Sequence, residues 1–429
     1  MNIKLLLIFI LVILISGTSF GQENNVESSL HQRLQQHTDE IFEDLVKIRR
    51  DFHRHPEISG QEEMTSGKIA NYLDSLGLEV KTNIGGYGLV GILNGDKKGR
   101  RIAWRADIDA MPSNIPDVVE YKSVTPGVRH ICGHDVHTTI ALGIANVLNR
   151  HKDDLAGPVY FLFQPAEESY LGAKAMIEDG LYEIINPDEI YALHISPFPV
   201  GTLSTKSGLV YAHTNKVEVV YKNTGKEESQ INRTKELISS FQNVDPESKF
   251  WNMENLGDPE VGIDSPNTIF RDFFTIKEKF DIQKNNNHLT ITATLNTDSK
   301  SKLDDFLIDL QDKILGSELS ADLVSVRYSY EKEVVNNDKD LTQNTIKSIQ
   351  DIYGESSFIP VYGVVTGDRG DDFAYFQKSI PGVYYYLGGA NYETGVISMP
   401  HAPDFNVDEE SIRFGVKYFS SMIMERVNE

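Results

Sequence analysis

The stretch Ile102-Ala103-Trp104 is a short apolar run, and Arg105-Ala106-Asp107-Ile108-Asp109 follows it directly. A short apolar run that ends in charged residues is typical of a buried strand. Residues 88–93, 159–163 and 190–193 have the same apolar character. Together the four runs predict the strands of one central sheet.

Helical patterns lie between these predicted strands. In residues 138–149, Ile140, Ile144, Val147 and Leu148 fall on one face of a helix. Strands that alternate with helices predict an α/β fold, with a mostly parallel sheet covered on both sides. Ligands of such sheets bind beyond the carboxyl ends of the strands, so the residues that follow each strand are the candidate site residues.

The pattern changes between residues 214 and 333. Strands are predicted at 217–221, 273–280, 288–295 and 323–330, and helices at 229–241 and 303–315. This βαββαβ order predicts a separate α+β domain inserted into the first one. A helix at 341–353 and a strand at 383–387 return the chain to the first domain. The predicted first domain therefore has two segments, 22–213 and 334–429, on either side of the insert at 214–333.

The N-terminus has the features of a Sec signal peptide, residues 1–21. Lys4 precedes an apolar run at 5–15, and small residues lead to a cleavage point after Gly21. The run is shorter than the about 20 apolar residues that a membrane span needs. The sequence thus predicts export to the periplasm or the cell exterior, without a membrane anchor.

The net charge limits the classes of binding partner, and the cysteine content limits the role of the thiol. The chain has 41 Lys and Arg against 63 Asp and Glu, a net charge of −22, which disfavours binding to nucleic acid or to an anionic membrane. Its single cysteine, Cys132, cannot form an internal disulfide in an oxidising compartment. A lone thiol there is either a buried inert residue or a metal ligand.

Candidate ligands for a metal follow the predicted strands. Asp107 follows one strand, Glu167 and Glu168 follow another, and His194 follows a third, while the loop 130–137 contains Cys132-Gly133-His134. Each has an ordinary alternative: a helix cap, a solvated loop, a core histidine or a buried cysteine. Their convergence on one edge of the sheet favours a divalent ion, since Zn²⁺ binds thiolate, imidazole and carboxylate.

Adjacent Glu167 and Glu168 predict a division of roles. One carboxylate can bind the metal while its neighbour takes a proton from the attacking water. We assign Glu168 as the ligand and Glu167 as the general base.

These motifs resemble the metal-dependent aminoacylase/carboxypeptidase family, and within it the branch of hippurate hydrolases, auxin-conjugate amidohydrolases and N-acyl-amino-acid deacylases. The resemblance extends from about residue 45 to the C-terminus and rests on the segments 49–57, 105–112, 132–137, 163–168, 173–176 and 371–376, and on His401.

The resemblance implies a zinc-peptidase-like domain with a ferredoxin-like lid, and a homodimer formed through that lid. It also implies two divalent metal ions, Zn²⁺ or Mn²⁺. Cys132 would bridge the ions, His134 and His194 would complete one site, and Glu168 and His401 the other. Glu167 would be the base, and Asp107 would orient a ligand imidazole.

The predicted lid departs from the family pattern. Relatives usually have a Gly-Gly-His-Ala segment after the first lid strand, but residues 222–227 contain no histidine. Asn267 resembles the substrate-binding asparagine of the family, whereas Asn296 occupies the position expected for an arginine. A substrate carboxylate would lose a bidentate partner there.

The expected function is therefore hydrolysis, by a dinuclear metal centre, of the amide bond of an N-acyl amino acid or a similar small conjugate. Two alternatives remain open. A dipeptidase or aminopeptidase would use the same metal centre, and a catalytically silent relative would bind a metal or ligand without turnover.

Overall fold

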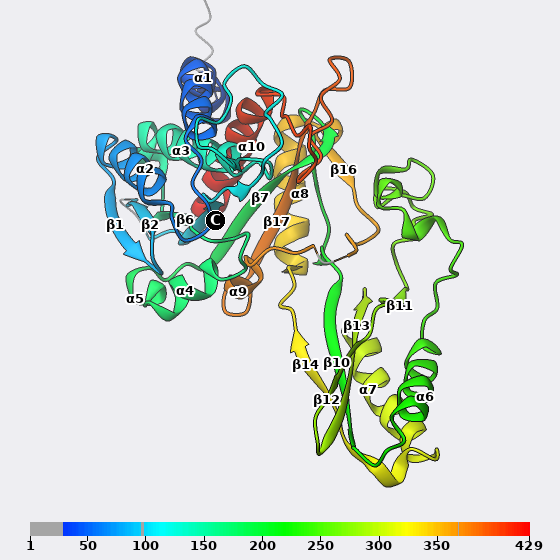
Figure 1. Ribbon diagram of the computed structural model, residues 1–429. Helices are drawn as coiled ribbons and strands as arrows, with labels where there is room; N and C mark the ends of the chain where they lie inside the picture. The colour runs from blue at the N-terminus through cyan, green and yellow to red at the C-terminus, as the bar shows by residue number, and fades with distance from the viewer. Residues whose placement is uncertain (1–28, 96–97, 368) are drawn as a thin grey trace, which may run out of the picture.

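The computed structural model describes residues 29–95, 98–367 and 369–429, which form two lobes (Figure 1). The predicted signal peptide lies outside these residues. No helix in the described part of the chain is long and apolar enough to cross a membrane.

The larger lobe contains an eight-stranded sheet in the order β1-β2-β6-β3-β7-β17-β8-β16. Its four central strands, β6, β3, β7 and β17, are parallel to one another. This arrangement confirms the predicted α/β class with a mostly parallel sheet. The strands are β1 (Glu79–Ile84), β2 (Gly88–Leu93), β3 (Ile102–Asp107), β6 (Val159–Gln164), β7 (Glu189–Pro199), β8 (Leu203–Thr205), β16 (Phe358–Pro360) and β17 (Gly382–Ala390).

Several strands extend beyond their apolar runs because their polar ends still pair with neighbours. Asp107 at the end of β3 lies opposite Gln164 at the end of β6. His194 lies inside β7, opposite Tyr386 of β17, rather than after the strand. Strand pairing thus fixes the backbone of two predicted site residues.

Helices cover both faces of this sheet. One face packs against α1 (Leu30–Arg54), α2 (Glu63–Ser75), α3 (His134–Arg150), α8 (Lys339–Tyr353) and α10 (Glu410–Asn428). Trp104 of β3 is fully buried there, with its ring centroid 4.5 Å from that of Phe419 in α10. The other face packs against α4 (Gly172–Glu178), α5 (Leu181–Ile184) and α9 (Ala374–Gln377).

The smaller lobe has its own sheet and hydrophobic cluster. Its strands follow the order β11-β13-β10-β14, and β12 also pairs with β13. The elements are β10 (His213–Lys222), α6 (Glu227–Ser239), β11 (Phe274–Ile276), β12 (Asp281–Lys284), β13 (His288–Thr297), α7 (Lys300–Leu315) and β14 (Leu323–Glu331). Apart from the division of the second strand into β11 and β12, this is the predicted βαββαβ order.

Part of the inserted segment packs against the larger lobe. Phe250, Phe270 and Phe273 share a hydrophobic cluster with Tyr384 of β17. The amide of Val364 also donates to the Phe270 carbonyl at 3.0 Å. Four short strands complete the fold in two pairs, β4 (Met111–Pro112) with β5 (Val128–Arg129) and β9 (Gly208–Leu209) with β15 (Asn336–Asn337).

Candidate metal centre

The five predicted metal ligands come from four separate segments of the larger lobe. Cys132 lies in the loop before α3, His134 is the first residue of α3, and His194 lies in β7. Glu168 follows β6, and His401 lies in the loop between β17 and α10. The structure brings all five together at the carboxyl end of the parallel strands, the edge at which such sheets bind ligands.

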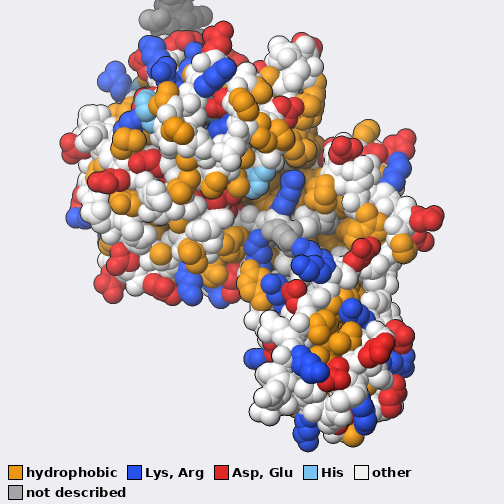
Figure 2. All heavy atoms as spheres, viewed as in Figure 1, with side chains coloured by type: hydrophobic (Ala, Val, Ile, Leu, Met, Phe, Trp, Pro, Cys, Tyr) orange, Lys and Arg blue, Asp and Glu red, His pale blue; other side chains and the backbone are white. Residues whose placement is uncertain are grey.

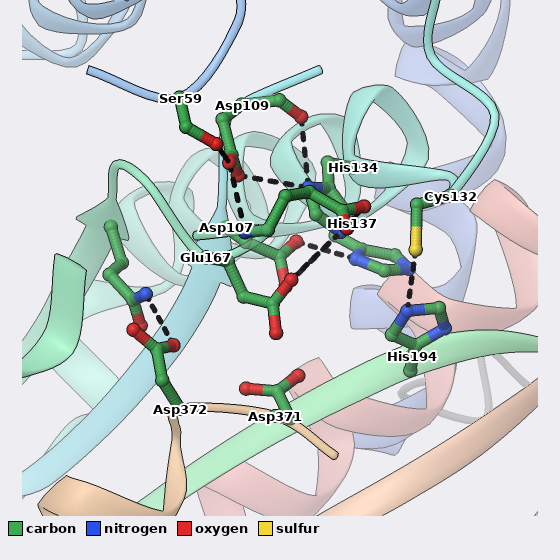
Figure 3. A network of polar contacts seen from close by, with 12 residues as sticks. Ser59, Asp107, Asp109, Cys132, His134, His137, Glu167, His194, Asp371 and Asp372 are labelled. Atoms are coloured by element: carbon green, nitrogen blue, oxygen red, sulfur yellow. Dashed lines mark hydrogen bonds and ion pairs between the residues drawn. The ribbon is translucent and has the colours of Figure 1, made fainter. Parts of the chain in front are cut away.

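The Cys132 sulfur lies at the centre of this cluster. Its Sγ is 3.2 Å from His194 Nε2 and 3.1 Å from His401 Nε2. Figure 3 shows the thiol pointing toward His194. Two possible ligand groups therefore share one sulfur: Cys132 with His134 and His194, and Cys132 with Glu168 and His401, the atoms of each group lying within 4.8 Å of one another.

Glycine at position 133 is required for this turn. Gly133 has φ +97°, and a Cβ there would lie 2.5 Å from Ile195 Cγ2. L-residues with side chains rarely adopt such a backbone. The glycine therefore lets the flanking thiol and imidazole face one site.

Two buried polar atoms in the cluster fit a bound cation. His134 Nε2 and Glu168 Oε1 have no hydrogen-bond partner among the described residues, and they lie 3.8 Å apart. Leaving such atoms unpaired costs free energy, and a shared cation would satisfy both. Burial and the nearby Glu168 carboxylate raise the pKa of the Cys132 thiol well above its usual value, an effect that a coordinating cation reverses.

Hydrogen bonds on the outer ring nitrogens orient two of the imidazoles. His194 Nδ1 donates to the Ile195 carbonyl at 2.7 Å, which leaves the lone pair of Nε2 facing Cys132. Burial and the neighbouring His137 imidazole hold the pKa of His194 well below its usual value, so the ring stays neutral. His134 Nδ1 lies 2.9 Å from the Asp109 carbonyl and 3.1 Å from its carboxylate.

Asp107 therefore has a different partner from the one expected. Its Oδ1 lies 2.6 Å from Nδ1 of His137, which is not among the predicted ligands. Asp109 holds the outer nitrogen of His134 instead, and sequence reasoning missed this role. The alternation in Asp107-Ile108-Asp109 was the available signal, since residues two apart at a strand end face the same side.

Glu167 lies beside the two ligand groups that contain Cys132 but belongs to neither of them. Its side chain is buried, and its Oε2 is 3.8 Å from His134 Nε2. Burial and the negative charges of Asp371 and Glu168 raise the pKa of the Glu167 carboxyl well above its usual value. A buried carboxylate next to a metal position suits a group that accepts and returns a proton.

Buried Arg105 joins this region to the C-terminal segment. Its guanidinium lies 2.7 Å from Asp107, 3.0 Å from Asp371 and 3.2 Å from Asp372. The Asp371-Asp372 pair thus has a structural partner that the sequence motif alone did not reveal.

The cluster opens to solvent on the side of His401. The His401 side chain is 50% exposed, whereas that of Glu168 is 11% exposed. Figure 2 shows a histidine side chain at the surface where the two lobes meet, with hydrophobic and basic side chains beside it. A small substrate can therefore approach the cluster from the side of His401.

The two asparagines singled out for substrate recognition lie in the inserted segment. Asn267 is exposed, and its side chain forms no hydrogen bond within the described residues. Asn296, at the position expected for an arginine, is buried and accepts a hydrogen bond from Thr214 at 2.8 Å. That position therefore offers a satisfied neutral amide and no positive charge.

Comparison with known proteins agrees with this geometry. The model of peptidase family M20/M25/M40 matches residues 103–425. The chain belongs to this family. It is 31% identical to thermostable carboxypeptidase 2 of Saccharolobus solfataricus over 90% of this chain and 96% of the relative. It is 29% identical to N-acetyldiaminopimelate deacetylase of Enterococcus faecalis over 89% of this chain and 97% of the relative.

A solved structure extends the agreement to the whole fold. The Bacillus subtilis YXEP protein, described as a dinuclear metal binding peptidase, superposes with a TM-score of 0.71 at 25% identity. The match covers 91% of this chain and 99% of that one. Family membership confirms the predicted class, a metal-dependent hydrolase of amide bonds, and the two ligand groups agree with a cofactor of two divalent ions.

Proposed function

We propose that this M20 enzyme is exported and hydrolyses the amide bond of an N-acyl amino acid or a similar small conjugate. The observation that carries the proposal is the pair of ligand groups that share the Cys132 sulfur. His134 and His194 would complete one metal position, and Glu168 and His401 the other. The chemistry of these donors suits zinc, and manganese is the alternative.

The residues around the ligands define the steps that the protein itself performs. Bound divalent ions would act as Lewis acids on the amide carbonyl and would lower the pKa of a water molecule. Glu167 would accept a proton as that water attacks the amide carbonyl, and it would then donate the proton to the departing amine. Asp109 and the Ile195 carbonyl would keep two imidazoles in the tautomer that presents Nε2 to the site.

The substrate class is supported by the relatives and by the residue at position 296. The similar proteins include a carboxypeptidase and a deacetylase of an N-acetylated amino acid. The neutral Asn296 indicates that a substrate carboxylate is not bound by an arginine at that position. We therefore expect activity on small acylated amines, with a weaker requirement for a free carboxylate than in relatives that have the arginine.

A substrate panel tests this proposal. Purified protein would be incubated with N-acetyl and N-benzoyl amino acids, their amides and a set of dipeptides, each with added Mn²⁺ or Zn²⁺, while bound metal is counted by elemental analysis. Turnover of the acylated compounds supports the proposal. Turnover of dipeptides alone would identify a dipeptidase or aminopeptidase, and two bound ions with no turnover would identify a silent binding protein.

Export is supported by the N-terminal sequence. Lys4, the apolar run at 5–15 and the small residues up to Gly21 have the order of a cleavable signal peptide. Mass spectrometry of the protein secreted by its native host should give a mature N-terminus at Gln22. An intact N-terminus in the cytoplasmic fraction would contradict export.

A homodimer through the smaller lobe is supported by exposed apolar side chains on that lobe. Ile308 and Leu315 of α7 are 63% and 50% exposed, and Val324 and Tyr330 of β14 are 48% and 44% exposed. β14 is also an edge strand, so its backbone can pair with a second chain. Such a surface fits a second copy of the same lobe.

A further inference from the structure

The histidine ligands of the two proposed metal positions differ in how firmly the protein holds them. His134 and His194 lie on a helix and a strand, and each has a bonded outer nitrogen. His401 lies on a loop, is half exposed, and has the left-handed backbone conformation at φ +66°. No hydrogen bond to its Nδ1 occurs among the described residues. The orientation of His401 therefore depends on whatever holds its loop.

Two contacts tie the His401 loop to the segment that carries Cys132. The His401 amide donates to the Ile131 carbonyl at 2.7 Å. Nη1 of Arg129 donates to the Pro403 carbonyl at 3.2 Å. Arg129 is three residues before Cys132, and Pro403 is two residues after His401. The Arg129 guanidinium thus links the segment that carries Cys132 to the loop that carries His401.

Arg129 is itself fixed on its other side. Its Nε donates to Asp117 Oδ1 at 2.5 Å, and its Nη1 also reaches the Ile115 carbonyl at 3.2 Å. Asp117 accepts a further hydrogen bond from the Ser123 amide at 2.8 Å. The Arg129 side chain is only 3% exposed, and moving it away would remove the guanidinium from a buried carboxylate whose other partners are the Ser123 amide and His53. The guanidinium is therefore a rigid support for the Pro403 carbonyl.

We propose that Arg129 is a positioning residue for the metal position formed by Cys132, Glu168 and His401. It holds the His401 loop over Cys132, and so it sets the affinity of that position while leaving the position of His134 and His194 unchanged. The inference rests on the proposed dinuclear centre, but it concerns a residue that contacts neither substrate nor metal.

Substitution of Arg129 should therefore lower the affinity for one of the two ions. Changing residues that support metal ligands typically weakens binding 10- to 100-fold. Arg129→Gln should show this loss for one ion. Arg129→Lys should show a smaller loss, because an ammonium keeps the charge near Asp117 but cannot span three acceptors in fixed directions.

Arg426 provides a matched control. Its side chain is also 3% exposed and pairs with Glu189, at the start of β7 and the opposite end of that strand from the metal cluster. Arg426→Gln removes a buried arginine of equal exposure without touching the His401 loop. His401→Ala serves as the reference for loss of the loop ligand itself.

The experiment measures bound metal by elemental analysis after dialysis of these proteins, expressed at full length, against graded chelator. We expect two ions in the wild type and in Arg426→Gln, and one ion in His401→Ala. Both Arg129 variants should lose one ion at a chelator concentration at least tenfold lower than the wild type, and should recover turnover when Mn²⁺ is in excess.

Different results overturn different statements. If the wild type holds two ions and either folded Arg129 variant keeps both at the wild-type chelator concentration, the positioning role is refuted while the proposed function stands. Loss of both ions together, with a lower melting temperature of the metal-free protein, would mean a general structural role and also refutes it. A wild type that binds no metal refutes the proposed function instead.

Discussion

Replacing Glu167 by Gln should lower turnover at least a hundredfold and leave both metal positions filled. The two side chains have nearly the same volume, so the buried site keeps its packing. Glu167, Asp371 and Asp372 have carboxylate oxygens within 4.8 Å of one another, and the substitution removes one of these like charges. The folded state should therefore be no less stable than that of the wild type.

The magnitude follows from the role assigned to the carboxylate. A positioned general base contributes typically 10²- to 10⁴-fold to the rate. At about 1.36 kcal/mol for each factor of ten, the barrier should rise by about 2.7 to 5.4 kcal/mol. The Michaelis constant should change little, because the missing interaction forms during proton transfer and not on binding.

Glu168→Gln is the matched comparison, since it changes the adjacent carboxylate in the same way. We expect it to lose the ion bound by Cys132, Glu168 and His401, because an amide oxygen is a weaker ligand than a carboxylate. Steady-state kinetics, elemental analysis and thermal melts of both variants separate the two roles. If Glu167→Gln loses metal while Glu168→Gln keeps it, the two assignments are reversed; turnover within tenfold of the wild type would mean that Glu167 is not the base.

Three further outcomes are expected. Arg105→Met should destabilise the fold by about 3 to 5 kcal/mol in chemical denaturation, because it removes the buried guanidinium that pairs with three buried carboxylates. Burial lowers the pKa of the half-buried imidazoles of His37 and His151; repulsion from His151 adds to this effect on His37, and the charge of Arg33 adds to it on His151. The unfolded chain therefore binds protons at these two residues more readily than the folded chain does. The contribution of these two imidazoles to the unfolding free energy should therefore fall as the pH drops from 7 to 5, so His151→Gln should gain stability relative to the wild type over that interval in urea titrations at the two pH values. Ile308→Glu and Val324→Glu should each shift the mass measured by light scattering from dimer to monomer, and a wild type that is already a monomer would contradict the proposed interface.

The sequence predicted the elements of the fold more accurately than their ends. The apolar runs identified β2, β3, β6, β7 and β17, because burial on both faces leaves a continuous apolar signal, whereas β1, β8 and β16 were not predicted. The end of β7 was not predictable from such a run, since Ile195 to Pro199 stay in the sheet by pairing with β17. Likewise α3 begins at His134, four residues before the predicted start at residue 138. Its first turn is mostly polar although it is buried in the site, so no apolar pattern marked it.

The candidate site was predictable only where chemistry appears as a local pattern. Cys132, His134 and the glutamate pair occur in short motifs with ligand spacing, so they could be found from the residues alone. His401 is a single histidine in an irregular loop, and only the family resemblance identified it. The link between Arg105 and Asp371 joins residues 266 positions apart, and no local pattern reports a contact of that kind.

The position of β17 has a consequence for biogenesis. This strand lies in the middle of the sheet between β7 and β8, all nine of its residues are buried, and it ends at Ala390 of a 429-residue chain. A nascent polypeptide cannot close the sheet until residues 382–390 have left the ribosome, and His401 emerges later still. Under the proposed export, a precursor that stays open for so long would suit a translocation channel that accepts only unfolded chains.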